Sequence, residues 1–483
     1  MVTPTLKRPT LKRSSALVRY GGFFLSVGAA RVFGVLITSV TFPILVRRLG
    51  VEMYGLWSYV VAVCAFFEVV ANPGLTTHTA QQVAAHRNAA AGLIPDFLAL
   101  RGLSSLVATI ALLVVASFEV RPEVHSLLRW YGVGSLCVGL TGSDFLLTSL
   151  ELFHMRSLLT LIQQALYASG VFLLVHTRKD ILWVPASILG SALLSNLAGW
   201  LVLWKSGFHP TVAIVPSRWR AILVPSLHYA ATTMMATIYH RTGHLVVRWF
   251  LGDHALGLYA AAVRFVDILR NFVLVVLSVL MPRMALAAQS RAGLKRLVQA
   301  AVSALAAVSI PLTLGTLATA HLVVPWVLGA SYVAAVGPVR WMAAYMVAAP
   351  IASLLSGTVL YALGRHRDYL VSATVGAFVA VLSSLVLVRA FGLVGVCVAF
   401  ILAEVAVDVT AYLLIPHDLR DLWKNPFIAV AGFSALLMVA AVRLMNSYSS
   451  RPLLVVAAGA GVYSIAASVL GRKMLMKQFG GTK

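Results

Sequence analysis

Acidic residues are scarce in this chain: 15 Asp and Glu stand against 38 Lys and Arg, and charged residues of both signs make up only 11% of the sequence. Soluble domains are about one quarter charged. Hydrophobic residues, by contrast, account for 60% of the chain. This balance excludes an ordinary soluble protein and indicates an all-α polytopic membrane protein.

Other absences exclude several kinds of chemistry. The only cysteines are Cys64, Cys137 and Cys397, which lie far apart inside apolar runs. This placement predicts buried packing and neither a disulfide nor a metal cluster. The sequence contains no GxxxxGK[ST] phosphate loop, no HExxH and no paired CxxC. We therefore expect no ATP hydrolysis, no metal site and no cofactor. The connections between apolar runs are too short for a soluble catalytic domain, so we also expect no enzymatic activity.

Long apolar runs dominate what is present, and a membrane helix needs about 20 such residues. The predicted spans lie near 23–46, 54–74, 97–119, 126–151, 157–176, 181–204, 222–249, 256–281, 296–320, 332–363, 369–389, 393–415, 426–445 and 452–470. These are about 14 transmembrane helices. The first has a basic segment before it and no small-residue cleavage site after it, which predicts an uncleaved span.

Positive charges are concentrated on one side of these alternating spans. The clearest groups are "LKRPTLKR" at the N-terminus, "SRAGLKR" at 290–296 and "GRKMLMK" at 471–477. The positive-inside rule then places both termini in the cytoplasm. The expected location is the inner (plasma) membrane of the cell. Topology thus explains the formal charge of +23, and no nucleic-acid partner is expected.

An internal repeat indicates how the chain is organised. "LGVEMYGLW" begins at Leu49 and "LGDHALGLY" at Leu251, each after the first helix of a set of six. Two six-helix bundles of the same orientation would be related by an axis along the membrane normal. The predicted parts are a basic cytoplasmic N-terminus (1–17), two pseudo-symmetric bundles (18–210 and 211–425), two additional helices (426–471) and a basic cytoplasmic tail (472–483).

Charged residues near the middle of two predicted spans need an explanation, because each costs about 2.5–3.5 kcal/mol on insertion scales. On a helix, residues 264, 267, 270 and 271 fall within an arc of about 120°. The preceding span has a similar polar face. Because arginines outnumber the single acid beside them, and a guanidinium fork binds two phosphate oxygens, we expect an anion-binding cavity. The candidate diphosphate-binding residues are Arg31, Arg241, Arg264 and Arg270, and the polar cavity candidates are Thr38, His240, His244 and Asn271.

Acidic residues in the spans form a second set. Candidates for charge pairs or ion coupling are Glu68, Asp144, Asp267, Glu404 and Asp408. Asp267 at i,i+3 from Arg264 and Arg270 could instead form a purely structural internal pair. Glu404 and Asp408, at i,i+4, share a helix face, where hydrogen-bonded helix packing is the alternative. Gln163 and Gln164 are candidates either for sugar contacts or for helix-end capping.

Several segments resemble a known family in order and spacing. They are "PILVRRLGVEMYGLWSY" (43–59), "LELFHMRSLLTLIQQ" (150–164), "FLGDHALGLYAAAVRFVDIL" (250–269), "VLGASYVAAVGPVRWMAAYMVAAPIASLLSGTVLYALGRHRDY" (327–369) and "FGLVGVCVAFILAE" (391–404). With the 14-span pattern, the chain resembles the polysaccharide transporters, the Wzx-type flippases of the multidrug/oligosaccharidyl-lipid/polysaccharide superfamily. The resemblance implies a MATE-like fold whose two bundles work by alternating access.

The same resemblance implies a substrate and partners. The substrate would be a polyprenyl-diphosphate-linked oligosaccharide, such as an O-antigen, capsule or exopolysaccharide repeat unit, moved from the inner to the outer leaflet. Expected partners are this glycan, membrane lipids, and the glycan polymerase and chain-length proteins of the pathway. A lipid II flippase remains an alternative. A multidrug antiporter would favour an acid-rich cavity, and a glycan polymerase or ligase would favour a large external loop.

Overall fold

A computed structural model describes residues 13–85, 94–150, 152–207, 214–287, 290–420, 426–448 and 451–479. Within these residues the chain is almost entirely helical and contains no strand. Within these ranges, side chains are described from residue 32 onward, except for residues 84 and 85, several between 276 and 291, residue 426 and those beyond 472. The basic N-terminal segment 1–12 lies outside the described residues.

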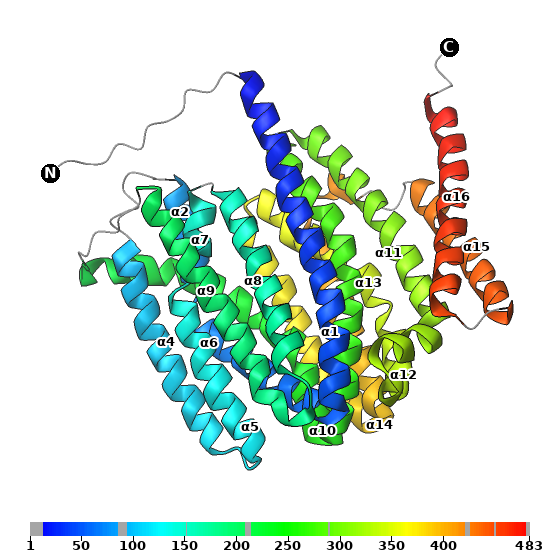
Figure 1. The fold of residues 1–483 in the computed structure, drawn as a ribbon. Coiled ribbons are helices and arrows are strands. Elements are labelled where there is room, and N and C mark those ends of the chain that lie inside the picture. Colours follow the sequence, from blue (N-terminus) through cyan, green and yellow to red (C-terminus); the bar gives the residue numbers. More distant parts are fainter. Residues whose placement is uncertain are drawn as a thin grey trace. The chain divides into compact units, whose positions relative to one another are not determined.

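The first half of the chain forms a series of helices, several of them long. They are α1 (Arg13–Ala71), α2 (Leu75–Ala85), α4 (Ile94–Ser117), α5 (Pro122–Leu127), α6 (Val133–Leu140), α7 (Asp144–Ser149), α8 (Phe153–Leu174) and α9 (Trp183–Lys205). The second half contains α10 (Trp219–Ala287), α11 (Arg291–Leu328), α12 (Val336–Met342), α13 (Tyr345–Leu354), α14 (His366–Leu414), α15 (Pro426–Tyr448) and α16 (Pro452–Phe479). Figure 1 shows these elements along the chain.

Eight helices of the described residues are long and apolar enough to cross a membrane, or nine if the pair Ala330–Met342 and Tyr345–Leu360, bent by 47°, is one span. Helices α1 and α14 each contain two predicted spans, joined at a break. Helix α10 also contains two predicted spans but is not among the eight, and it carries the charged residues noted in the sequence. The all-α polytopic fold is confirmed, while the number 14 remains approximate.

The predicted span 126–151 is not one continuous helix. A π-helical turn (Leu128–Gly132) links α5 to α6, and the chain leaves the helix between α6 and α7. Helix α9 satisfies carbonyl groups at this break: Asn196 Nδ2 donates to the Val138 oxygen at 3.2 Å, and Trp200 Nε1 donates to the Thr141 oxygen at 2.8 Å. Side-chain donors from a neighbouring helix therefore allow the break inside an apolar segment.

The cysteine prediction was wrong at one position. Cys64 and Cys397 are buried, whereas Cys137 is exposed on α6. An apolar run does not distinguish a buried face from a lipid-facing one, because a membrane helix is apolar on both.

The helices form two compact units. The first comprises residues up to Leu45 and Val60–Thr237, and the second comprises Val46–Tyr59 and Ile238 onward. In the first unit, α4 lies beside α6 (Figure 1), and the rings of Phe97 and Phe145 lie 4.5 Å apart in its core. The bundle limits 18–210 and 211–425 stay a prediction.

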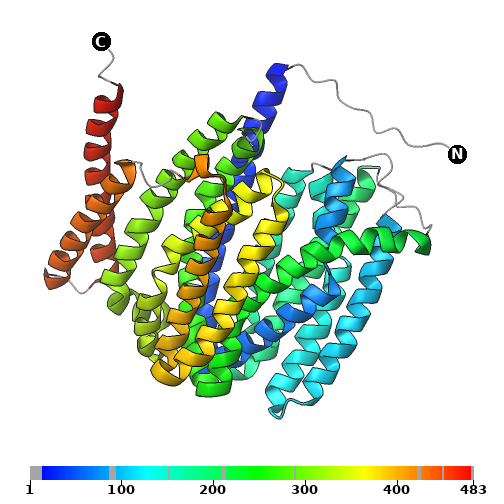
Figure 2. The same ribbon diagram turned by 180° about the vertical axis from the view of Figure 1, so that it is seen from behind.

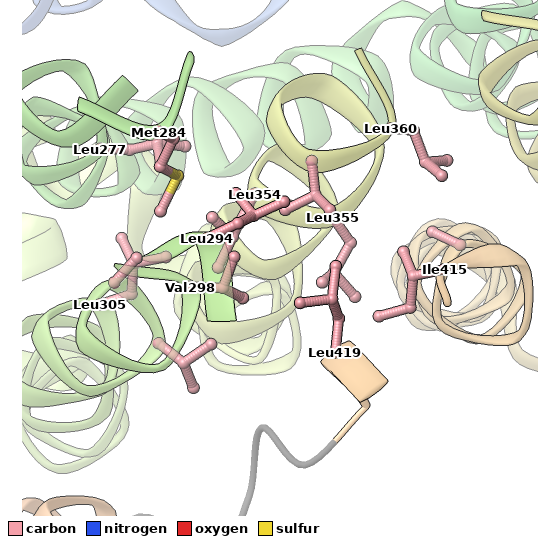
Figure 3. Packing of buried hydrophobic residues seen from close by; sticks show 14 of the residues in the cluster. Leu277, Met284, Leu294, Val298, Leu305, Leu354, Leu355, Leu360, Ile415 and Leu419 are labelled. Carbon is pink, nitrogen blue, oxygen red and sulfur yellow. The ribbon is translucent and has the colours of Figure 1, made fainter. Parts of the chain in front are cut away.

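The second unit has a core of aliphatic side chains from four helices. Figure 3 shows Leu277 and Met284 of α10, Leu294 and Leu305 of α11, and Leu354 of α13 converging. Ile415 and Leu419, which follow α14, complete the cluster. Helices α15 and α16 run side by side next to α11 of the same unit in both views (Figures 1 and 2).

The repeated Leu-Gly motif has the same backbone geometry in both copies. Gly50 has φ 75° and Gly252 has φ 84°, a conformation that favours glycine because it has no Cβ. Each glycine therefore breaks a long helix, and the next helix starts within a few residues. Five residues further on, a Cβ on Gly55 would overlap the carbonyl oxygen of Asp253, and one on Gly257 would overlap that of Val51. The two copies thus pack reciprocally within the second unit.

This reciprocal contact makes Gly257→Ala an informative substitution. The added methyl has no room between α10 and the 46–59 segment, so we expect overpacking to destabilise the fold by about 1–3 kcal/mol. Thermal unfolding of the detergent-purified protein measures the effect. Gly461→Ala is the matched control, because no atom lies within 4 Å of a Cβ at that helical position. Equal melting temperatures for the two variants would show that the contact is not tight.

Candidate functional site

A group of polar and aromatic side chains lies inside the second unit, where α10, α13 and α14 meet. We call it the central polar cluster, and it consists of Tyr239, His240, Asp267, Arg270, Tyr345, Phe400 and Glu404. The break at Gly252 allows both halves of α10 to contribute. Four of the seven residues, His240, Asp267, Arg270 and Glu404, are candidates identified from the sequence.

Arg270 is held by two partners in this cluster. Its Nη2 lies 3.3 Å from Asp267 Oδ1, and its Nη1 donates a hydrogen bond to the Tyr345 hydroxyl at 2.5 Å. The guanidinium carbon also lies 5.1 Å from the centre of the Tyr345 ring. Both members of the ion pair are largely shielded, with 19% and 25% of their side chains exposed. The pairing of Asp267 with Arg270, left open by the sequence, is therefore present, whereas Arg264 is not paired with Asp267.

The carboxylates of α14 lie deeper than the sequence alone indicates. Glu404 is 2% exposed and accepts a hydrogen bond from the Tyr239 hydroxyl. Its Oε2, and the Oδ1 of Asp408 one turn later, are buried and have no hydrogen-bond partner among the described residues. Arg270 lies within electrostatic range of Glu404. The cluster thus balances one arginine with two acids, and it has spare acceptor atoms.

Aromatic side chains form one wall of the cluster. The Tyr345 and Phe400 rings lie 4.9 Å apart, and the His240 and Phe400 rings lie 6.1 Å apart. The centres of the Tyr239 and His240 rings lie 3.8 Å apart, with the rings tilted by 34°. Sequence reasoning missed these residues. The available signal was a tyrosine deep within an apolar segment, since tyrosines of membrane proteins gather at the interfaces.

Two more candidates, Arg241 and His244, follow His240 within about one turn of α10. His244 is 5% exposed, and its ring meets that of Tyr259 edge-on at 5.2 Å. Its Nδ1 has no hydrogen-bond partner among the described residues. Arg241 is half-buried and lies within electrostatic range of His240 and His244. In the described part of the chain Arg241 makes no ion pair or hydrogen bond.

Arg264 differs from Arg270, although both lie on the same helix. Its side chain is exposed, and within the described ranges it makes no ion pair or hydrogen bond. Asn271, beside Arg270, is half-buried. The side chain of Arg31 lies outside the described residues. Arg264 and Arg241 are thus the two candidate arginines whose charge no described carboxylate offsets.

The remaining candidates belong to the first unit. Thr38 donates to the Gly34 oxygen of its own helix at 3.0 Å. Glu68 is exposed near the end of α1, and Asp144 is exposed at the start of α7. Gln163 and Gln164 lie within α8, so they do not cap a helix end. Gln164 contacts Gly34, where a Cβ would overlap its amide.

Sequence reasoning also missed Arg101 of α4. Its guanidinium lies within 4 Å of the Cβ positions of Gly139 and Gly142, at the break between α6 and α7. It is within electrostatic range of Asp144. A cation at a helix C-terminus is favourable because the last carbonyl groups carry partial negative charge. We interpret Arg101 as a residue that stabilises the break.

Solved structures of membrane transporters share this fold. Lipid II flippase MurJ in an inward closed conformation has a TM-score of 0.73 at 14% identity, covering 94% of this chain and 99% of that chain. A multidrug resistance MATE transporter in an inward-facing conformation has a TM-score of 0.62 at 14% identity, covering 84% and 99%. A Pyrococcus furiosus transporter of the MOP superfamily, described as having a binding pocket of reverse polarity, has a TM-score of 0.56 at 14% identity, covering 87% and 96%.

Sequence comparison identifies the family. A search among curated proteins gave no match. The sequence profile of the polysaccharide biosynthesis protein family matches residues 22–288. This is more than half of the chain, and it includes both copies of the Leu-Gly motif and the candidate residues of α10. The protein therefore belongs to the polysaccharide biosynthesis protein family.

Proposed function

We propose that the protein is a flippase that moves a polyprenyl-diphosphate-linked oligosaccharide from the inner to the outer leaflet by alternating access. Family membership supports the glycan pathway, and the MurJ- and MATE-like fold is one that transporters use. A polyprenyl tail can remain in lipid during such a step. Only the diphosphate and the sugars then need a polar path across the hydrocarbon core.

The observation that carries this proposal is the unpaired arginine charge of α10. Arg264 is exposed and Arg241 half-buried, and no described carboxylate pairs with either. In a membrane segment such charges are costly and therefore indicate a function. A diphosphate matches them, because the planar guanidinium binds two phosphate oxygens. We assign the main diphosphate contact to Arg264, with Arg241, Arg270 and Arg31 as supporting cations and Thr38, His240, His244 and Asn271 as polar contacts.

The membrane potential supports the direction of transport. The cell interior is negative, so each negative charge that moves outward gains about 2.3 kcal/mol per 100 mV. An anionic head group is therefore driven outward without ATP. The acids of the central polar cluster, with Glu68 and Asp144, remain candidates for charge pairing or for coupling to an ion.

Lipid II is the second candidate substrate. It has the same polyprenyl-diphosphate chemistry, and the MurJ structure spans nearly the whole chain. The arginines would serve either substrate, so the sugar moiety decides between them. A cationic drug is less suited to Arg264 and Arg241, since both repel a positive charge.

Reconstitution of the purified protein in proteoliposomes tests the proposal. Polyprenyl-diphosphate-N-acetylglucosamine serves as the probe, and a membrane-impermeant lectin measures how much of it becomes accessible on the far leaflet. We expect transport of this probe to exceed that in protein-free vesicles. Lipid II, assayed in parallel, identifies the alternative if it is moved faster. Extrusion of a cationic dye with no movement of either lipid would contradict the proposal.

A further inference from the structure

A groove lies in the second unit between α11, α15 and α16, and none of its lining residues belongs to the central polar cluster. The three helices run next to one another in Figures 1 and 2. Its volume is about 780 Å³, within the range of ligand-binding cavities. Phe427 and Val430 of α15 line one side, and the faces of α11 and α16 form the others. The lining is mainly apolar, and polar groups are few.

Small residues on facing helices create this groove. Ala300, Ala304 and Ala307 follow one another along one face of α11. Ala467 and Gly471 lie at i,i+4 on α16. In membrane proteins small residues usually let two helices approach closely. Here the short side chains leave a groove between helices that otherwise pack together.

The groove is about one leaflet tall. From Arg296 to Ala307 an α-helix rises by about 16 Å, which is roughly half of a hydrocarbon core about 30 Å thick. Its far end is bounded by Tyr463, whose hydroxyl donates to the Ala307 oxygen at 2.5 Å and links α16 to α11. The long axis thus fits a lipid chain that stays within one leaflet.

The near end of the groove is polar and positively charged. Arg296 is exposed at this end, and Gln299 and Ser303 follow over the next two turns. The connection 290–296 belongs to the side that the distribution of positive charge predicts to be cytoplasmic. Basic pockets between membrane helices on that side bind anionic lipid head groups.

We propose that this groove binds one anionic phospholipid of the cytoplasmic leaflet. The phosphate lies against the Arg296 guanidinium, and one acyl chain follows the alanines of α11 toward Tyr463. A polyprenyl chain is several times longer than an acyl chain and extends beyond a groove of one leaflet. The bound lipid fills the space between α11 and the α15–α16 pair and stabilises their packing. This proposal does not depend on which substrate is transported.

Native mass spectrometry and thermal unfolding of the delipidated full-length chain test this proposal. Phosphatidylglycerol should bind and raise the melting temperature, whereas phosphatidylcholine should do so much less. Arg296→Gln removes the phosphate contact and should weaken phosphatidylglycerol binding about tenfold or more, as expected for a charge-assisted hydrogen bond. Arg443→Gln is the matched control, because Arg443 is exposed on α15 but does not line the groove.

A second variant tests the apolar part of the groove. Ala467→Trp fills the space beside α16 and should abolish phosphatidylglycerol binding even though Arg296 remains. Three results would overturn the proposal: equal binding of the two phospholipids, equal losses in Arg296→Gln and Arg443→Gln, or displacement of phosphatidylglycerol by a polyprenyl phosphate at lower concentration. The Arg296→Gln comparison stands even if Ala467→Trp fails to fold.

Discussion

Replacing Arg264 with Ala is expected to lower transport of the polyprenyl-diphosphate probe by about 10- to 100-fold and to leave the melting temperature nearly unchanged. The expected loss corresponds to one charge-assisted contact worth about 1.5–3 kcal/mol. Stability should hold because Arg264 is exposed and makes no ion pair or hydrogen bond in the described part of the chain. The proteoliposome assay and thermal unfolding, run on the same preparation, separate the two effects.

Two further variants show whether the loss comes from the guanidinium. Arg264→Lys keeps the positive charge but loses the fork that binds two oxygens, so its transport should be intermediate. Arg340→Ala is the matched control, because Arg340 is an exposed arginine of α12 outside the polar cluster. Full transport by Arg264→Ala would contradict the assignment. Equal losses of transport in Arg264→Ala and Arg340→Ala would show that the loss depends only on the net charge of the protein and not on the position of Arg264.

The fold could be predicted from the sequence because the bilayer imposes a strict rule. Every backbone group in hydrocarbon must be satisfied internally, so long apolar runs become helices. The predicted span 157–176 corresponds to α8, and 181–204 corresponds closely to α9. Breaks inside an apolar run could not be predicted in the same way. The interruption near Thr141 depends on donors from Asn196 and Trp200, which are distant in sequence.

The candidate site could be predicted only in part. Helical periodicity placed Asp267 and Arg270 on one face, and the structure shows them paired. Periodicity could not show which arginine Asp267 would bind, because Arg264 is also three residues away. The choice depends on Tyr345 of α13, which holds the other side of the Arg270 guanidinium. Contacts between helices therefore decide which charges are paired, and a one-dimensional pattern does not contain them.

Replacing Asp267 with Asn is expected to destabilise the protein by about 1–3 kcal/mol. The substitution leaves the largely shielded Arg270 charge without its ion-pair partner. Loss of one member of a fully buried pair costs about 3–5 kcal/mol, and of an exposed pair about 0–1 kcal/mol. The pair here, 19% and 25% exposed, lies between these limits. Chemical or thermal unfolding in detergent measures the change.

The double variant Asp267→Asn/Arg270→Gln distinguishes a structural pair from a substrate-binding arginine. If the two residues mainly neutralise each other, the double variant should lose less stability than the sum of the single losses, with a coupling of about 0.5–3 kcal/mol. Transport should then recover together with stability. If the double variant is stable but does not transport the probe, Arg270 also contacts the diphosphate, and its pairing with Asp267 positions the guanidinium for that contact. Additive stability losses would contradict the ion pair itself. The charge of Arg270 would then have to be balanced by Glu404. The loss of stability in a Glu404→Gln variant, measured alone and together with Arg270→Gln, tests that alternative.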